Sequence, residues 1–279
     1  AKFGRSGRIL ATYSVMGKYS FVDCPFEITF GGKEEKYQDF YSAESLSPIQ
    51  KINISDFDDM SSFSYGIEHF SHKTNHFFRN RENPTSMMFA NNDWTDVNIC
   101  RGVNGEYSDE LVVTAVYSRL CSLNTLLLHA SYVDYEGNGI IFTGPSGIGK
   151  TTQAELWEKY RNATIVNGDK VFVRLVDDKF HAYGFPWKGS SEYGINKKSE
   201  LKGIVVLLQS DKNSIRKINS IEAMQLFFPH VFLPRWDEAC MHDLLNSFNL
   251  LLEKTPIWLL ECNLEEEAVK ITEKAIFNK

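Results

Sequence analysis

Near the middle of the chain, one stretch has the residue types and spacing of a phosphate-binding loop. It matches the pattern G-x-x-x-x-G-K-[ST] and consists of Gly144, Pro145, Ser146, Gly147, Ile148, Gly149, Lys150 and Thr151. Its glycines let backbone N–H groups turn inward around a phosphate, and the start of a following helix adds a positive field. The sequence therefore predicts that this loop binds a nucleotide or another phosphate.

The end of this loop carries the side chains that could act on the phosphates. We expect the Lys150 ammonium to reach the outer phosphates and the Thr151 hydroxyl to ligate Mg²⁺. Thr152, the next residue, is included among the nucleotide-binding residues. Lys150 is thus a candidate for catalysis as well as for binding.

The sequence on either side of the loop indicates the elements that position it. Residues 126–135 (LLLHASYVDY) and 140–143 favour two strands, because both are largely apolar and Gly-rich turn residues separate them. Apolar residues at helical spacing follow the loop, at Ala154, Leu156, Trp157 and Tyr160. Another helix is predicted over 109–123, with Ser108 as its cap. The loop therefore lies between a strand and a helix.

A bound Mg²⁺ needs a carboxylate in addition to the Thr151 hydroxyl, and two acids follow apolar strands. Asp169 ends a short apolar run soon after the loop helix. Asp211 follows the stronger run 204–208 and resembles a conventional Walker B position, but turn residues come directly after it. Because strand ends gather at one rim of an α/β sheet, we favour Asp169 as the metal ligand.

The front half of the chain is predicted to be β-rich and carries no motif whose chemistry can be named. Turn residues separate runs of β-branched and aromatic residues, which are 19–30, 51–54, 76–78, 86–89 and 93–99. We interpret these runs as a small antiparallel domain. Residues 1–15 are basic and are interpreted as an arm or an extraneous extension.

Composition limits the classes of protein to which the chain can belong. Its 279 residues, 43% hydrophobic and 24% charged, are typical of one large globular domain or two modest ones. No apolar run reaches the ~18 residues of a membrane helix, so we expect no membrane partner. The net charge of −6 argues against a nucleic-acid partner. Five scattered cysteines without zinc spacing favour reduced thiols and a cytoplasmic protein.

The order of these features resembles one known family. Leu128-His129-Ala130-Ser131, the loop at 144–151 and Asp169 close behind it resemble the catalytic domain of HPr kinase/phosphorylase, in the phosphoenolpyruvate carboxykinase-like superfamily. That family has a histidine on the strand before the P-loop, which His129 matches. It also has an Asp-Asp pair on the next strand, and Asn167-Gly168-Asp169-Lys170 falls there.

A second segment extends the resemblance downstream. Gly184-Phe185-Pro186-Trp187-Lys188-Gly189-Ser190-Ser191 fits the Gly-x-Pro-Trp pattern of a looser set of HPr-kinase-like bacterial proteins. The resemblance covers residues 108–279. It implies an α/β (α+β) fold, with a phosphoenolpyruvate carboxykinase-like P-loop catalytic domain at 108–279 and a small β-rich domain before it at 16–107.

The resemblance also implies an activity. It is that of a kinase that uses ATP and Mg²⁺ to transfer the γ-phosphoryl group to a hydroxyl, Ser of a peptide or protein, in a chain that could form a homo-oligomer. His129, Asp169 and Lys150 would be catalytic, and Thr151 and Asp169 would hold the metal. His129 would handle the proton or orient Asp169.

The Gly/Ser-rich loop after the Pro-Trp pair is open to two interpretations. Lys188 could meet phosphate oxygens, and Ser190 and Ser191 could bind phosphate or substrate, because loops at strand ends often carry function. Alternatively, it is an ordinary connection in which Trp187 serves as a packing anchor.

One departure from the family keeps two other functions open. Gly168 stands where the first Asp of the pair would be. The chain could therefore be a nucleotide-binding partner protein with little or no transfer activity. A conventional P-loop ATPase or GTPase that uses Asp211 is the third possibility.

The tail of the chain is interpreted as structural. The spacing predicts helices that start at Ser220, at Trp236 and at Leu264, with a strand over 256–262 before the last one. Asn263 and Glu266 have the spacing of a capping box for the last helix. His230 and His242 are interpreted as helix-end or surface residues.

Overall fold

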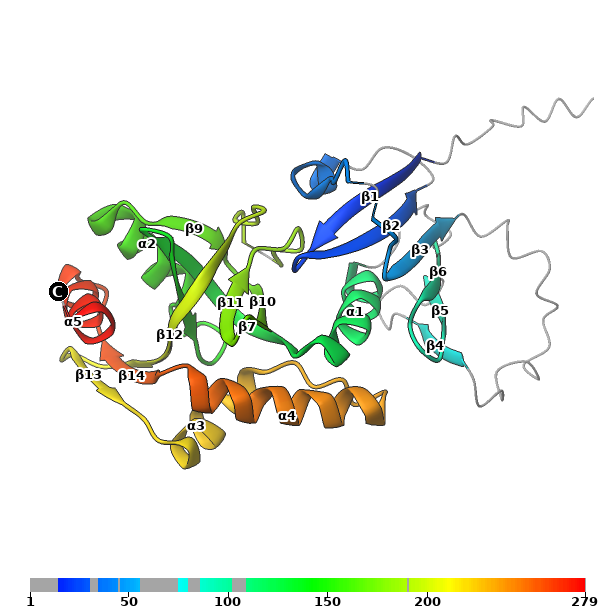
Figure 1. Cartoon of the computed structure of the whole chain (residues 1–279). Coiled ribbons are helices and arrows are strands. Elements are labelled where there is room, and N and C mark those ends of the chain that lie inside the picture. The colour runs from blue at the N-terminus through cyan, green and yellow to red at the C-terminus, as the bar shows by residue number, and fades with distance from the viewer. Residues whose placement is uncertain are drawn as a thin grey trace, which may run out of the picture. The chain divides into compact units, whose positions relative to one another are not determined.

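The computed structural model describes residues 15–30, 35–44, 46–55, 75–79, 86–101, 109–189 and 191–278. The chain divides into two compact units, which are each described separately (Figure 1). The first unit comprises Ala1–Ser20 and Cys24–Val112, and the second comprises Phe21–Asp23 and Val113–Lys279. The predicted cap Ser108, the loop residue Ser190 and residues 1–14 lie outside the described residues.

The first unit is built on a mixed sheet with the strand order β1-β2-β3-β6-β5-β4. Its strands are β1 (Val15–Phe21), β2 (Cys24–Phe30), β3 (Gln50–Ser55), β4 (Asn75–Arg79), β5 (Met87–Asn91) and β6 (Asp96–Cys100). The prediction of an antiparallel domain was wrong for half of this sheet, because β3 runs parallel to both β2 and β6. Only the β4–β5 and β5–β6 pairs are antiparallel among the pairings with a described register.

The run 19–30, predicted as one strand, is two strands joined by a tight turn. Val22 and Asp23 both have positive φ angles, 55° and 57°, which reverse the chain between β1 and β2. Along β2 every second side chain is buried, as expected for a strand with one face on a core. These side chains, with two from the 3₁₀ helix η1 (Glu35–Phe40), form part of the core: Cys24, Phe26, Ile28, Phe30, Tyr37 and Phe40.

The second unit contains a sheet in the order β11-β10-β7-β8-β12-β14-β13, with β9 also paired to β7. Its strands are β7 (Thr125–Tyr135), β8 (Asn138–Thr143), β9 (Thr164–Asn167), β10 (Lys170–Val176), β11 (Lys179–Tyr183), β12 (Lys198–Gln209), β13 (Ser214–Lys217) and β14 (Ile257–Cys262). β12 runs parallel to β8 and β14. Since β11 also pairs with β12, the strands β7, β8, β12, β11 and β10 form a closed circuit.

The helices α2 (Lys150–Arg161), α4 (Glu238–Lys254) and α5 (Glu266–Phe277) of the second unit contact strands of this sheet (Figure 1). The second unit also contains α3 (Ser220–Leu226) and most of α1 (Asp109–Leu120), which starts in the first unit. α2 and α5 pack together on one face, where Trp157 and Ala154 meet Phe142 and Val205 of the strands in a buried apolar cluster. The strand–loop–helix context of the glycine loop is thereby confirmed.

α3 starts at Ser220, as predicted, and is capped by Asn219, whose side chain accepts from the Glu222 N–H while the Glu222 carboxylate accepts from the Asn219 N–H. The starts of the two later helices need correction. α4 starts at Glu238, with Asp237 as its N-cap, and not at Trp236. α5 has Glu265 at its N-cap and no side-chain cap, so the capping box predicted at Asn263 was wrong. Asn263 is instead bonded to Asn213, which accepts from its backbone N–H and donates to its side-chain oxygen.

Two further properties bear on the expectations from composition. Within the ranges that the structure describes, no helix is both long enough and apolar enough to cross a membrane. All five cysteines are buried.

Candidate functional site

The glycine loop leaves β8 at Thr143 and enters α2 at Lys150. Gly147 and Gly149 have φ angles of 77° and 106°, which residues with a side chain rarely adopt, so glycine is needed at both positions. The buried Lys150 side chain folds back, and its Nζ donates to the carbonyl oxygens of Gly144 (3.2 Å) and Pro145 (3.1 Å). Burial lowers the pKa of Lys150, and the nearby Asp169 carboxylate acts in the opposite direction.

Opposite the loop, the line of β9 and β10 along β7 is interrupted by a bend at Gly168-Asp169. The register along β7 is the same on both sides of this bend, because Asn167 is paired with Tyr132 and Lys170 with His129. Ala130 N donates to Asp169 O (3.0 Å), and Ser131 Oγ donates to Gly168 O (3.2 Å), so both carbonyls of the bend are bonded to β7. The side chains of Asp169 and Lys170 meet at the bend, where Lys170 Nζ donates to Asp169 Oδ2.

Asn167 fixes the shape of this bend, and the sequence analysis assigned it no role. Its side chain is fully buried, and its Oδ1 accepts from the N–H groups of Asp169 and Lys170, both at 3.0 Å. Its Nδ2 donates to Phe185 O (2.9 Å), which connects the bend to the Gly-x-Pro-Trp segment. The signal for Asn167 was its place inside the Asn-Gly-Asp motif, but the resemblance drew attention to the carboxylate alone.

The Asp169 carboxylate lies between two basic side chains. Its Oδ1 is 3.4 Å from His129 Nε2, and its Oδ2 accepts from Lys170 Nζ at 3.1 Å. The hydrogen bond from His129, followed by the bond and charge of Lys170, holds the pKa of Asp169 at about 2, against the opposing effect of burial. Asp169 is therefore ionised at neutral pH.

The loop and the bend are connected by the Thr151 hydroxyl, whose Oγ1 donates to Gly168 O at 3.5 Å. At the other end of the loop, Thr143 Oγ1 of β8 donates to His129 O of β7 at 3.0 Å. The structure thus brings together Lys150, Thr151, His129 and Asp169, the four residues to which the sequence analysis gave catalytic or metal roles. Pro145, Ser146 and Gly147 are exposed, and Thr152 is partly buried at the start of α2.

The Pro-Trp segment packs closely on the bend at Gly168-Asp169. A Cβ atom added to Gly168 would overlap Ser191 Oγ and lie 2.6 Å from Ser191 Cβ. A Cβ atom added to Gly189 would overlap the Asp169 carboxylate, at 2.6 Å from its Cγ. Ser191 therefore fills the space that a side chain at 168 would take, which explains in steric terms why glycine stands there.

Two residues of this segment have other surroundings than a phosphate site requires. Lys188 is exposed, and its Nζ donates to Glu192 O (2.9 Å) within its own loop. Trp187 is buried, with its ring 4.5 Å from that of Phe185, so it is a packing anchor. The Ser190 prediction lies outside the described residues.

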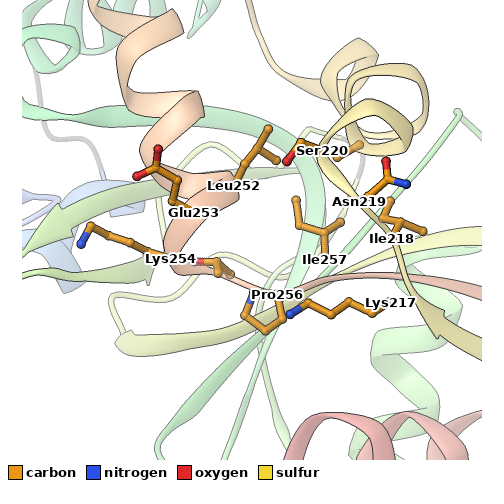
Figure 2. A pocket seen from close by; sticks show the side chains of 11 residues that line it. Lys217, Ile218, Asn219, Ser220, Leu252, Glu253, Lys254, Pro256 and Ile257 are labelled. Atoms are coloured by element: carbon orange, nitrogen blue, oxygen red, sulfur yellow. The ribbon is translucent and has the colours of Figure 1, made fainter.

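Two other places in the second unit are separate from these residues. Asp211 is exposed in the turn between β12 and β13. A pocket of about 380 Å³ is lined by Lys217, Asn219, Glu253 and Pro256 among others (Figure 2). The pocket includes Ile257, at the start of β14. The glycine loop follows the end of β8, and β8, β12 and β14 are parallel. The pocket and the loop therefore lie at opposite ends of these strands.

The metal prediction depends on mixed ligands. Within the described ranges, no three His, Cys, Asp or Glu side chains gather so as to hold a metal ion. Thr151 and Asp169 could hold a cation only together with ligands from elsewhere, such as phosphate oxygens and water.

Comparison with known proteins assigns the chain to a family. Residues 108–265, more than half of the 279 residues, match the family described as SynChlorMet cassette protein ScmC. The chain belongs to the ScmC family. The part of this ScmC chain that matches contains the glycine loop, the bend at Gly168-Asp169 and the Pro-Trp segment.

The comparisons with solved structures and with curated proteins assign no further family or activity. Among solved structures, the ScmC chain is similar to the Hpr(Ser) kinase/phosphatase from Coxiella burnetii, over 53% of this chain and 95% of that one. The sequence identity is 10% and the TM-score is 0.33, so this likeness assigns no activity to the ScmC chain. No curated protein matches it.

Proposed function

We propose that this chain is an ATP-dependent kinase that transfers the γ-phosphoryl group of ATP to a hydroxyl, Ser of a peptide or protein. The observation that supports it is the meeting of the glycine loop with the His129–Asp169 pair. Thr151 Oγ1 lies 3.5 Å from the carbonyl of Gly168, whose neighbour Asp169 is bonded to His129. Loop, cation and paired acid and base are the parts that phosphoryl transfer needs, because such catalysis is mostly positioning and charge neutralisation.

The residues present fit Mg²⁺ as the metal. The Thr151 hydroxyl and the Asp169 carboxylate are hard oxygen donors, and Asp169 is ionised because its pKa is held at about 2. When bound, Mg²⁺ would neutralise negative charge on the phosphates. To serve as a ligand, Asp169 must release at least one of its contacts with His129 and Lys170.

The remaining steps fall to side chains of the protein. Lys150 would leave the carbonyls of Gly144 and Pro145 and donate to the outer phosphate oxygens. Asp169 accepts from His129 Nε2, so this nitrogen carries hydrogen and Nδ1 of a neutral imidazole is left to accept the proton of the acceptor hydroxyl. Asp169, with a pKa of about 2, is too weak a base for that proton.

A nucleotide-binding protein without efficient transfer is the second candidate. It is favoured by the composition of the bend, because Gly168 brings no carboxylate and both oxygens of Asp169 already have basic partners. The two candidates predict the same binding of ATP and differ only in transfer.

Incubation with γ-labelled ATP, Mg²⁺ and a Ser-containing peptide library tests the proposal. We expect labelled peptide from the natural sequence and from Asp211→Asn, in which an exposed turn residue is changed, but almost none from Asp169→Asn. Binding of ATP without labelled peptide would favour the second candidate. Loss of activity in Asp211→Asn with full activity in Asp169→Asn would instead support a conventional P-loop ATPase or GTPase.

A further inference from the structure

A second histidine lies beside the glycine loop, brought there by the tail of the chain. β8 pairs with β7 from Tyr135 to Ala130 and then leaves the sheet at Thr143. Beyond that point, the short segment Val231–Phe232 takes its place along β7. Val231 forms an antiparallel bridge with Leu128, and Phe232 N donates to Leu127 O at 2.9 Å.

The register of this bridge places His230. In an antiparallel pair, the residue before Val231 lies opposite the residue after Leu128, so His230 is next to His129. On the other side of β7, Lys170 is the partner of His129. The ring of Phe232 is 6.4 Å from that of His129, which agrees with this register.

Packing holds His230 in position from both ends. Before it, Phe227 and Phe228 pack against Phe248 of α4, with ring centroids 5.5 and 4.9 Å apart. After it, Phe232 O accepts from the Tyr117 hydroxyl at 2.9 Å. His230 itself ends the 3₁₀ helix η5 (Phe228–His230), and its N–H donates to Phe227 O. The imidazole is therefore presented by a well-anchored backbone.

His230 has two basic side chains in its surroundings. Burial is the largest cause that lowers its pKa, and Lys150 and His129 lower it further. Lys150 comes from the glycine loop and His129 from β7, so basic groups of two separate elements face His230. A phosphate placed here would be attracted by the Lys150 ammonium and could accept hydrogen bonds from imidazole N–H groups, against the repulsion of the Asp169 carboxylate that contacts His129.

We propose that His230 binds the terminal phosphate of the nucleotide, opposite His129 and beside Lys150. This inference rests on the proposed function, since it assumes that the glycine loop holds a nucleoside triphosphate. It gives the tail of the chain a direct part in the site, in addition to the helix-end position that was predicted from the sequence and that His230 occupies.

Calorimetric titrations with Mg-ATP and Mg-ADP test this role. We expect His230→Asn and His230→Ala to weaken ATP binding about tenfold and ADP binding less than about twofold, because only ATP has the contacted phosphate. His242→Asn, at an exposed histidine on α4, is the matched control and should bind both nucleotides as the natural sequence does.

Each result decides one of the two claims. ATP binding unchanged in both His230 variants, or equal losses for ATP and ADP, would overturn the role of His230 and leave the proposed function standing. A natural sequence that binds no ATP would overturn the proposed function and this inference with it.

A second measurement needs no variant to fold. In protein labelled at its histidines and assigned through the backbone, saturating ATP should shift the imidazole signals of His230 more than ADP does, with His242 unmoved. Signals of His230 that respond identically to ATP and ADP would contradict the proposal.

Discussion

Nε2 of His129 lies 3.4 Å from Oδ1 of Asp169, although the two residues come from different strands of the sheet. Lys170, not Asp169, is the registered partner of His129, so the contact joins the imidazole to the residue before its partner, at the bend Gly168-Asp169. The contact keeps the carboxylate ionised and fixes the imidazole beside it. Acid and base therefore have separate roles at this site, which is the basis of the first prediction.

Asp169→Asn should remove a pH-dependent part of the stability. The pKa of Asp169 is about 2 in the folded protein and near 4 in an unfolded chain, so its contribution of about 2 kcal/mol is present above pH 4. It is lost as the pH falls from about 4 to about 2. Urea unfolding should show a stability difference between the natural sequence and Asp169→Asn that shrinks over this range.

Two further variants test the cause of this difference. Asp211→Asn, at an exposed turn, should follow the natural sequence at every pH. His129→Ala should raise the pKa of Asp169, measured by carboxylate NMR, because it removes the largest cause of the low value. A difference independent of pH between 2 and 6 would contradict the ionised pair.

Lys150→Ala should weaken Mg-ATP binding about 10- to 100-fold, because charge-assisted hydrogen bonds to phosphate are lost. The free energy of unfolding should change by only about 1 kcal/mol. Relief of the buried ammonium offsets the lost bonds to Gly144 and Pro145. Calorimetry and chemical denaturation measure the two effects. Lys159→Ala, at an exposed position of the same helix, is the control and should change neither.

Gly168→Ala should destabilise the second unit by about 1–3 kcal/mol, because the new Cβ overlaps the Ser191 side chain. In a Ser191→Gly background, the same substitution should cost less than about 1 kcal/mol. A double-mutant cycle by chemical denaturation measures this coupling. Additive effects would show that Ser191 is not the obstacle. The same crowding means that Gly168→Asp tests a restored carboxylate fairly only when Ser191 is also replaced.

Asn167→Ala should cost about 3 kcal/mol of stability and most of the activity, because two buried N–H groups lose their acceptor. Asn167→Asp keeps an acceptor but puts a fully buried carboxyl group against Phe185 O, so its loss of stability should be at least as large. Denaturation and phosphoryl-transfer assays measure both. Asn246→Ala, at an exposed position on α4, should stay within about 0.5 kcal/mol of the natural sequence. Full activity in Asn167→Ala would show that Asp169 needs no such support.

Local patterns predicted the elements around the glycine loop, because each of them is a short-range property. The two strands, the turn between them and the helix after Lys150 lie where periodicity and turn residues place them. By contrast, the run 19–30 has strand-forming residues throughout, and nothing in its composition shows that Val22 and Asp23 adopt positive φ.

Local sequence patterns could not predict which segments pair with β7. β8, β9, β10 and the Val231–Phe232 segment all pair with it, and sequence distance does not indicate which of them lies where. For this reason the roles of Asn167 and Ser191 and the position of His230 could not be inferred. They depend on which backbone passes beside another. The resemblance did indicate His129 and Asp169, and the structure brings them into contact.

The replacement of β8 by Val231–Phe232 along β7 has a consequence for the chain as it is synthesised. The glycine loop and its helix are complete once Arg161 has been made. The hydrogen bond from the Tyr117 hydroxyl to Phe232 O can form only later, because Phe232 is 115 positions after Tyr117. Until then Leu127 and Leu128 present an unpaired strand edge, which another chain can occupy. Chains released before this point would carry the whole phosphate-loop motif and yet be prone to aggregate.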